Sequence, residues 1–110
     1  MNNYTVNEGK TMAIISYITW IGTLIAYFMN NDKRNTFASF HIRQSFGLAV
    51  ISLINTFVLI QMFNTMTEGM FIGLAIFILR IIGLVGAVQG EEKKIPLLGD
   101  IFQDWFKNIA

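Results

Sequence analysis

The sequence predicts an all-α integral membrane protein with three transmembrane helices and a short C-terminal amphipathic helix that lies at the membrane interface. Hydrophobic residues make up 54% of the 110 residues, and charged residues only 14%. Apolar runs at about 12–29, 44–63 and 69–90 are long enough to span a membrane, since roughly 20 apolar helical residues cross the hydrocarbon core of a bilayer. A shorter amphipathic stretch follows at about 99–109. We expect a single domain over residues 1–110.

Composition excludes several classes of function. The chain has no cysteine and one histidine, which excludes disulfides, thiol catalysis and a Cys- or His-rich metal site. A net charge of +1 argues against nucleic-acid binding, which needs a basic patch. We therefore expect no cofactor, no metal and no nucleic-acid partner.

The first apolar run, Met12–Met29, holds 18 residues and no charge, which is just long enough to span. A cleaved signal peptide is disfavoured, because polar residues follow the run without a small-residue cleavage site. Thr19, Gly22 and Ala26 form a stripe of small residues that can receive another helix.

The second run begins with an amphipathic stretch, Phe37–Arg43, which we place in the headgroup zone as the first turns of the helix. Small and polar residues, among them Ser52, share one face of this run, with Asn55 beside that face near the middle of the run. Arg80 lies near the middle of the third run, so we hypothesise an Asn55–Arg80 hydrogen bond worth about 1 kcal/mol.

Arg80 is the one charge within the third run. A central arginine costs about 3 kcal/mol on an insertion scale, whereas each Leu, Ile, Phe or Val returns about 0.3 to 0.6 kcal/mol. Twelve such residues lie between Phe71 and Val88. Their summed gain of roughly 4 to 7 kcal/mol exceeds the cost, so insertion is expected.

Arg80 shares a stripe at alternating spacings of four and three with small residues, and small residues let another helix approach closely. We therefore place Arg80 on a packing face. Two interpretations remain: a charge that lines a cavity or grips a partner subunit, or a structural arginine that pairs with helix carbonyls or with Asn and Ser side chains. The counter-charge is expected from another chain or a lipid headgroup. The small residues of the stripe predicted to pack are Gly69, Gly73, Gly83 and Ala87.

The segments after the second run are short. The loop Asn64–Glu68 predicts that the second and third helices are antiparallel neighbours. In the tail, Asp100 suits a helix N-cap, and Trp105 and Phe106 lie on the apolar side of the predicted helix. This face is expected either to dip into the bilayer or to dock on a protein surface.

Three spans place the termini on opposite sides of the membrane. The first loop and the tail together hold six Lys and Arg residues, and the other side holds only Lys10. The positive-inside rule then places the N-terminus outside and the C-terminus in the cytoplasm.

Two short motifs carry a resemblance to a known family. They are the F-H-x-R-Q sequence Phe40–Gln44 at the start of the second helix and the closing Gly90…Pro96-Leu97. With the order of the helices, they resemble the Tic20-like family, small bacterial membrane proteins grouped with the chloroplast inner-envelope import component. The resemblance covers nearly the whole chain. It implies the bacterial inner membrane, a multi-pass topology and a role in protein translocation.

The residues of the first motif have two interpretations. His41 and Arg43 are expected at the cytoplasmic headgroup level, where they either contact a lipid phosphate or a partner, or anchor the helix through hydrogen bonds to helix ends. Gln44 shares the side of the helix that His41 occupies.

Three functions compete. The first is a non-catalytic accessory or scaffold subunit of a larger membrane complex, with protein translocation or secretion as the process. The second is an oligomeric anion channel or small-solute transporter with Arg80 lining the path. The third is a membrane enzyme, which we disfavour because the candidate acids and bases do not cluster at one depth. We expect the bilayer and other membrane subunits, identical or different, as partners.

Overall fold

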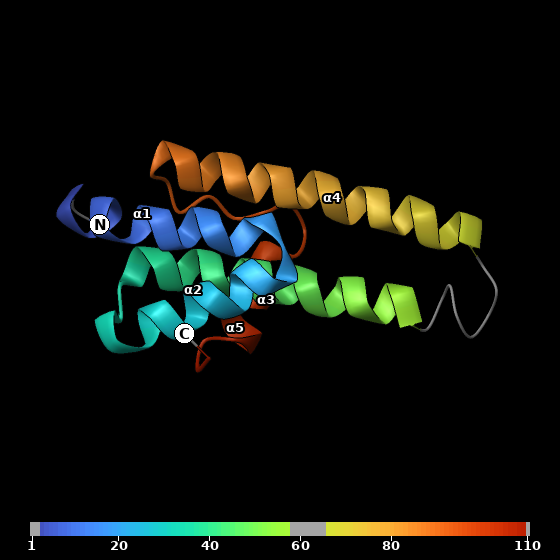
Figure 1. Cartoon of the computed structure of the whole chain (residues 1–110). Helices are drawn as coiled ribbons and strands as arrows, with labels where there is room; N and C mark the ends of the chain where they lie inside the picture. Colours follow the sequence, from blue (N-terminus) through green and yellow to red (C-terminus); the bar gives the residue numbers. More distant parts are fainter. Residues whose placement is uncertain (1–2, 58–65, 110) are drawn as a thin grey trace.

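The structure is a computed structural model that describes residues 3–57 and 66–109. Over these residues the chain is helical, without strands, and forms an elongated body of 48 × 23 × 22 Å. Figure 1 shows α1 to α4 aligned along the long axis, with the tail folded back beside them. The helices are α1 Asn3–Ile18, α2 Trp20–Lys33, α3 Thr36–Ile54, α4 Met66–Gln89 and α5 Gly99–Trp105.

The first apolar run forms two helices, so the single helix predicted over 12–29 is wrong. The break falls at Thr19, whose backbone is extended (φ −149°, ψ 172°) and whose hydroxyl oxygen accepts a hydrogen bond from the Gly22 N–H at 3.1 Å. This is an N-cap, which begins a new helix in a new direction. Among the described residues, two helices are long and apolar enough to span a membrane, Thr36–Phe57 and Gly69–Gln89.

A close contact between helix backbones holds α1 and α2 together as a hairpin. A Cβ atom on Gly22 would lie 2.2 Å from the carbonyl oxygen of Ile15, so glycine is required there. One turn further along α2, Ala26 is fully buried. The small residues predicted to receive another helix therefore receive α1, the helix that directly precedes them.

The turn from α2 to α3 rests on two asparagines. The Asn30 side chain accepts a hydrogen bond from the Asn35 N–H at 2.8 Å, and Asn35 caps α3 by accepting from the Ala38 N–H at 2.9 Å. The Asn35 amide also donates to the carbonyl oxygen of Thr5 at 2.9 Å. The beginning of α1 is thereby fixed beside this turn.

The end of α4 lies at the same end of the molecule. Gly90 has a left-handed backbone (φ 75°), and the Glu91 N–H donates to the Gly86 carbonyl at 2.9 Å, as in a Schellman cap. A Cβ on Gly90 would lie 2.9 Å from the Val6 side chain and 3.6 Å from that of Lys10. The N-terminal part of α1, the turn at 33–36 and residues 91–94 thus form one end, which we call the charged end.

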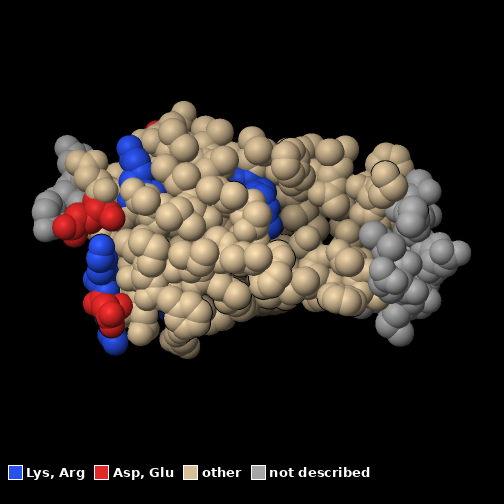
Figure 2. Space-filling model, in the orientation of Figure 1, with Lys and Arg blue, Asp and Glu red and all other residues tan. Residues whose placement is uncertain are grey.

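The charged end contradicts the prediction that the termini lie on opposite sides. Figure 2 shows Lys, Arg, Asp and Glu gathered at that end of the molecule, with a separate basic patch midway along it. Because the first run turns back at Thr19, α1 begins and α2 ends at the charged end. Lys10 therefore lies with the other basic residues and not opposite them.

Two predictions about the connecting segments need correction. The predicted second span of 44–63 begins earlier, at Thr36, and residues 58–63 lie outside the described residues, as does the start of the predicted 64–68 loop. In the tail, the N-cap is Leu98 without a side-chain bond, and Asp100 instead forms an ion pair with Lys94 at 2.6 Å. The tail helix ends at Trp105, short of the predicted residue 109.

Candidate functional site

Arg80 lies opposite the C-terminal end of α1. Its Nη1 donates to the carbonyl oxygen of Tyr17 at 3.1 Å, and the Thr23 hydroxyl donates to the Ser16 carbonyl at 2.8 Å. A helix end carries a partial negative charge and carbonyls without helical partners. The end of the α1 helix therefore supplies the negative partner of Arg80, which was expected from another chain or a lipid.

Asn55 does not contact Arg80, so the proposed hydrogen bond between them is wrong. The Asn55 amide donates to the Gly69 carbonyl at 2.9 Å and joins α3 to the beginning of α4. Its Oδ1 atom is buried without a hydrogen-bond partner. Arg80 lies near the middle of the span Gly69–Gln89, whereas Asn55 lies at the end of α3 beside Gly69, so the two residues are at different heights along the α3–α4 pair.

A buried polar cluster joins three segments near the charged end. His41 Nε2 lies 2.8 Å from the Glu91 carbonyl, and Nδ1 lies 2.7 Å from the Tyr17 hydroxyl. Since a carbonyl can only accept, Nε2 carries the proton and Nδ1 accepts from Tyr17. Gln44 donates to the same hydroxyl at 2.8 Å. The cluster thus ties α1 to α3 and to the segment after α4.

Gln44 also fixes the path of the tail. Its amide nitrogen donates to the Lys93 carbonyl at 3.1 Å, and its oxygen accepts from the Ile95 N–H at 2.8 Å. His41 and Gln44 are both fully buried. The structure therefore places these two side chains inside the protein and not at a surface where a lipid or a partner could meet them.

Arg43 and Gln103 hold the last helix. Arg43 donates to the Gln103 side-chain oxygen and to the Lys107 carbonyl, each at 3.3 Å, and Gln103 donates to the Phe40 carbonyl at 2.8 Å. A Cβ on Gly47 would lie 2.5 Å from the Phe102 ring. The tail thus docks on the protein's own α3, one of the alternatives left open by its sequence.

Trp105 and Phe106 do not share an environment. Phe106 packs edge-on against Phe46, with ring centroids 5.0 Å apart. Trp105 is 72% exposed, and Leu97 is 95% exposed with a left-handed backbone (φ 67°). The outer surface of the tail therefore remains available to lipid or protein through Trp105 and Leu97.

The stripe of small residues on α4 faces the rest of the protein. A Cβ on Gly83 would lie 2.5 Å from the Tyr17 ring, and Ala87 is fully buried. Gly69 is buried and accepts from Asn55, and a Cβ on Gly73 would lie 3.8 Å from the Asn55 amide nitrogen. On α3, Ser52 is half-buried. The stripe packs against α1 at one end and α3 at the other.

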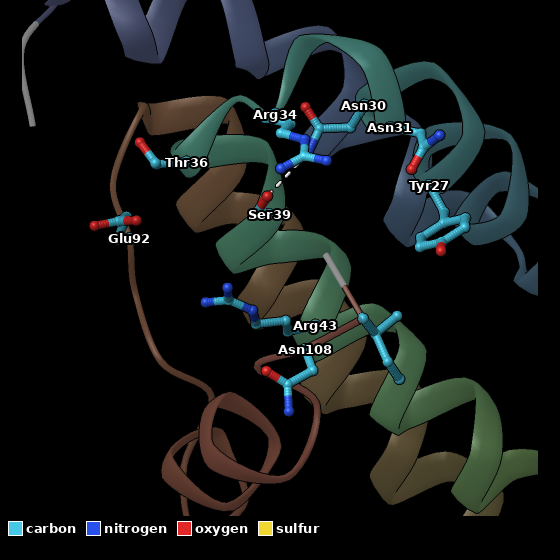
Figure 3. A pocket seen from close by; sticks show the side chains of 10 residues that line it. Tyr27, Asn30, Asn31, Arg34, Thr36, Ser39, Arg43, Glu92 and Asn108 are labelled. Carbon is cyan, nitrogen blue, oxygen red and sulfur yellow. Dashed lines mark hydrogen bonds between the residues drawn. The ribbon is translucent and has the colours of Figure 1, made fainter.

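A polar cavity of about 480 Å³ opens at the charged end. Figure 3 shows Arg34 and Arg43 on different sides of it, with Glu92 near its edge. Burial raises the pKa of Glu92, and Arg43 counteracts this effect. The cavity is lined by Tyr27, Asn30, Asn31, Arg34, Thr36, Ser39, Arg43, Glu92, Asn108 and Ile109. Within residues 3–57 and 66–109, no group of three or more His, Cys, Asp or Glu residues is placed to hold a metal.

Comparison with known proteins identifies the family. Residues 8–102 match the MamF/MmsF family, described as the magnetosome magnetite crystal formation protein family. The chain belongs to this family. The match includes most of α1, all of α2 to α4 and the first part of α5, and therefore every segment joined by the buried polar cluster.

Two proteins of Methanocaldococcus jannaschii, both described as UPF0132 membrane proteins, are similar to this chain. One is 34% identical over 94 residues, which cover 82% of this chain and 64% of the relative. The other is 33% identical over 102 residues, which cover 89% of this chain and 84% of the relative. No solved structure matches the chain. This MamF/MmsF protein is a small membrane protein.

The family corrects the resemblance to Tic20-like proteins, which is wrong, and removes the support for protein translocation. The motif Phe40–Gln44 led to the wrong family because its buried side chains form hydrogen bonds that the fold itself requires. His41 and Gln44 bond backbone groups of the segment after α4. Any short bundle that folds its tail back has this requirement, so five residues do not specify a family.

Sequence reasoning missed Tyr17 and assigned Thr19 to a packing stripe, whereas Thr19 is an exposed N-cap that begins α2. Tyr17 is a polar aromatic residue in the interior of an apolar run, which is a signal for a buried hydrogen-bond partner. Thr19, three residues before Gly22, has the spacing of an N-cap whose hydroxyl reaches a backbone N–H. The spacing of Thr19 and Gly22 could have predicted the break in the first run.

Proposed function

We propose that this MamF/MmsF protein is a non-catalytic accessory or scaffold subunit that acts in the membrane through its surfaces. The observation that supports this proposal is how the polar side chains inside the protein are paired. Tyr17, His41, Gln44 and Arg80 form hydrogen bonds with one another or with backbone groups of the same chain. These side chains connect the hairpin and the tail to α3 and α4, so their chemistry serves folding.

The outer surface offers contacts of two kinds. Apolar side chains of α2 and α4 face outward over most of their length, among them Trp20, Phe28, Phe71 and Phe77 at 53 to 69% exposure. The charged end adds the exposed basic and acidic residues of the α2–α3 turn and the tail. A bilayer contacts the first kind of surface, and subunits in the membrane or at its face contact the second.

We propose that the charged end faces the cytoplasm. Lys10, Lys33, Arg34 and Lys93 belong to the segments that form that end, and residues 44–79 contain no Lys or Arg. The positive-inside rule assigns the cytoplasm to the side rich in Lys and Arg. Both termini are then cytoplasmic. A cysteine introduced at Asn31 should resist a membrane-impermeant thiol reagent in intact cells and react once the membrane is opened; labelling in intact cells would reverse the orientation.

The family description suggests the process. We propose that members such as this one support magnetite crystal formation by organising the membrane around the crystal and not by chemistry on iron. In a magnetite-forming bacterium that lacks a family member, expression of this chain should restore crystal size, measured by electron microscopy. A Trp105→Ala, Leu97→Ala variant that still folds should restore it less well. The proposal would be contradicted if the chain folded and inserted into the membrane but the crystals stayed as defective as they are without it.

The accessory-subunit proposal is tested by isolating the tagged chain from its native membranes in mild detergent. We expect other membrane proteins in fixed stoichiometry, identified by mass spectrometry, and a reduced yield of them with the Trp105→Ala, Leu97→Ala variant. A matched control is Gln89→Ala, an exposed polar change away from the tail. A chain that purifies alone under every detergent condition would contradict the proposal. The structure gives no support to the anion channel, because Arg80 is bonded to the end of α1.

A further inference from the structure

The α1–α2 hairpin reaches only part of the way along α3 and α4 (Figure 1). Its tip is fixed by the bond from Arg80 to the Tyr17 carbonyl, two residues before Thr19. In the span Gly69–Gln89, Arg80 is 11 residues from the first residue and 9 from the last (80 − 69 and 89 − 80). At about 1.5 Å per residue, the tip of the hairpin lies near the middle of the span.

The two halves of the molecule therefore have different widths. In the half next to the charged end, which we call the covered half, α1 and α2 lie beside α3 and α4, and α5 packs on α3. In the other half, the bare half, the described residues are the last turns of α3 and the first turns of α4. Since each helix with its side chains is about 10 Å across, the covered half has about twice the cross-section of the bare half.

Burial follows the same division. Along α3 the side chains of Leu48 and Ala49 are buried, whereas Leu53 and Phe57 beyond them are 46% and 63% exposed. On α4, Phe71 is 69% exposed. The described residues of this chain thus leave the bare half to be covered by something else.

The hairpin displaces lipid on one side of the membrane. The outward face of α2 is apolar, with Trp20, Leu24 and Phe28 at 53%, 42% and 68% exposure. Because α2 runs from the middle of the span to the charged end, these side chains lie among the acyl chains of one leaflet. Of the described residues, those of α3 and α4 extend into the opposite leaflet.

We propose that this protein is a wedge that prefers, and favours, membrane curved so that the leaflet at the charged end is convex. A convex leaflet has more area per lipid at its surface, and a body that is wider in that leaflet fills the area without voids. Protein interiors are close-packed and yield little, so the bilayer adapts to the protein. Membrane binding by segments that insert into one leaflet is known to depend on curvature. This inference does not depend on the accessory-subunit role.

The occupant of the space beside the bare half is lipid in this proposal. A second copy of the chain placed there would even out the cross-section and remove the taper. The two cases differ in one measurement, the distribution of the protein between curved and flat membrane. A tapered body is enriched or depleted in curved membrane according to its orientation, whereas a body of even cross-section is distributed equally.

The test uses the full chain with a single cysteine, Lys33→Cys, which is possible because the natural chain has none. The protein is reconstituted in giant phosphatidylcholine vesicles, and a thin tube is pulled outward from each vesicle. A membrane-impermeant maleimide dye added outside labels only molecules whose charged end faces out. In a second sample every molecule is labelled first, and an impermeant quencher then silences those facing out.

We expect a higher protein-to-lipid ratio in the tube than in the vesicle for molecules with the charged end out, and a lower ratio for those with the charged end in. Equal ratios in tube and vesicle for both populations would overturn the proposal and support the second copy. Enrichment of both populations alike would also overturn it, since a taper must reverse sign with orientation.

Matched variants locate the effect. Trp20→Ala with Phe28→Ala narrows the covered half and should reduce the enrichment. Phe57→Ala with Phe71→Ala narrows the bare half and should preserve or increase it. All four side chains are more than half exposed, so helix content by circular dichroism should match that of the parent in both variants. Equal loss in the two variants would contradict a wedge.

Discussion

The covered half and the bare half of the span use buried polar side chains differently. In the covered half, the buried side chains of Tyr17, His41 and Gln44 come from two helices and bond to backbone groups or to one another. In the bare half, among the described residues, Asn55 is the buried polar side chain, and one of its two polar atoms has no partner.

The difference shows what polar residues inside this protein are for. A backbone group without a partner is expensive inside a membrane. The covered half contains a helix end at Ile18 and a non-helical segment at 91–95. Both have backbone carbonyls or N–H groups that find no partner within a helix. Among the described residues the bare half is helical, and its irregular stretch is the π-helical turn at 55–57, which begins at Asn55. Polar side chains are therefore placed where the backbone is irregular, and the predictions below test this rule.

The largest effect is expected from Gln44→Leu. It removes three hydrogen bonds, to the Tyr17 hydroxyl, the Lys93 carbonyl and the Ile95 N–H, each worth about 1 kcal/mol. We expect the free energy of unfolding to fall by about 3 kcal/mol, measured by thermal unfolding in detergent. The tail should also detach before the rest of the protein unfolds, measured by limited proteolysis. The control Gln89→Leu changes an exposed residue. Equal stability of the two variants would break the rule.

The next largest effect is expected from Gly22→Ala. The new Cβ would lie 2.2 Å from the Ile15 carbonyl oxygen, a backbone atom that cannot turn away, and overpacking of this kind costs about 2 kcal/mol. Gly73→Ala is the matched change in the bare half, where the nearest heavy atom is the Asn55 amide nitrogen at 3.8 Å. Alanine there should be neutral or stabilise the helix by up to about 1 kcal/mol. Both variants are measured in one series of thermal-unfolding experiments. If Gly73→Ala destabilised the protein more than Gly22→Ala, the contrast between the bare half and the covered half would be refuted.

Arg80→Leu should have a more local effect. It leaves the Tyr17 carbonyl at the hairpin tip without its donor, and a hydrogen bond from a charged group is worth about 2 kcal/mol. We expect faster amide hydrogen exchange in the last turn of α1, with little change in the first turns of α4. Arg80→Lys keeps a donor and should recover part of the protection. Exchange rates that do not respond to either substitution would show that Arg80 does not hold the hairpin.

Asn55→Leu should have the smallest effect. It removes one hydrogen bond to the Gly69 carbonyl, and interhelical bonds of this kind average about 0.6 kcal/mol. Removal of the buried Oδ1 atom, which has no partner, offsets part of that loss. Thermal unfolding in detergent should shift by less than in any variant above. A shift as large as that of Gln44→Leu would mean that the bare half depends on polar contacts as well.

Much of α4 could be predicted from the sequence. Its apolar run, its end at Gln89 and the spacing of its small residues all follow from local rules of length, capping and packing. The structural interpretation of Arg80, a bond to a helix carbonyl, was also among the alternatives. What the sequence did not show is which helix end it meets, because that depends on a break 61 residues earlier (80 − 19).

The break at Thr19 could not be predicted from hydropathy. Eighteen apolar residues fit a single span as well as they fit two helices that fold back within one leaflet. What separates the two is a backbone contact, between Gly22 and Ile15, and a capping hydroxyl. Because the number of spans was inferred from this run, the prediction placed Lys10 opposite basic residues beside which it lies at the charged end.

The folded-back hairpin also determines how little of the chain must be translocated when the protein is made. With the charged end in the cytoplasm, as proposed, the α1–α2 hairpin begins and ends on the side of synthesis, and the described helices that run toward the far side are α3 and α4, which the connection 55–68 joins. From Asn55 to Glu68 that connection contains a single charged residue, Glu68 itself. The bond from Arg80 to the Tyr17 carbonyl can form only after α4 has been synthesised, so this contact at the hairpin tip is made late.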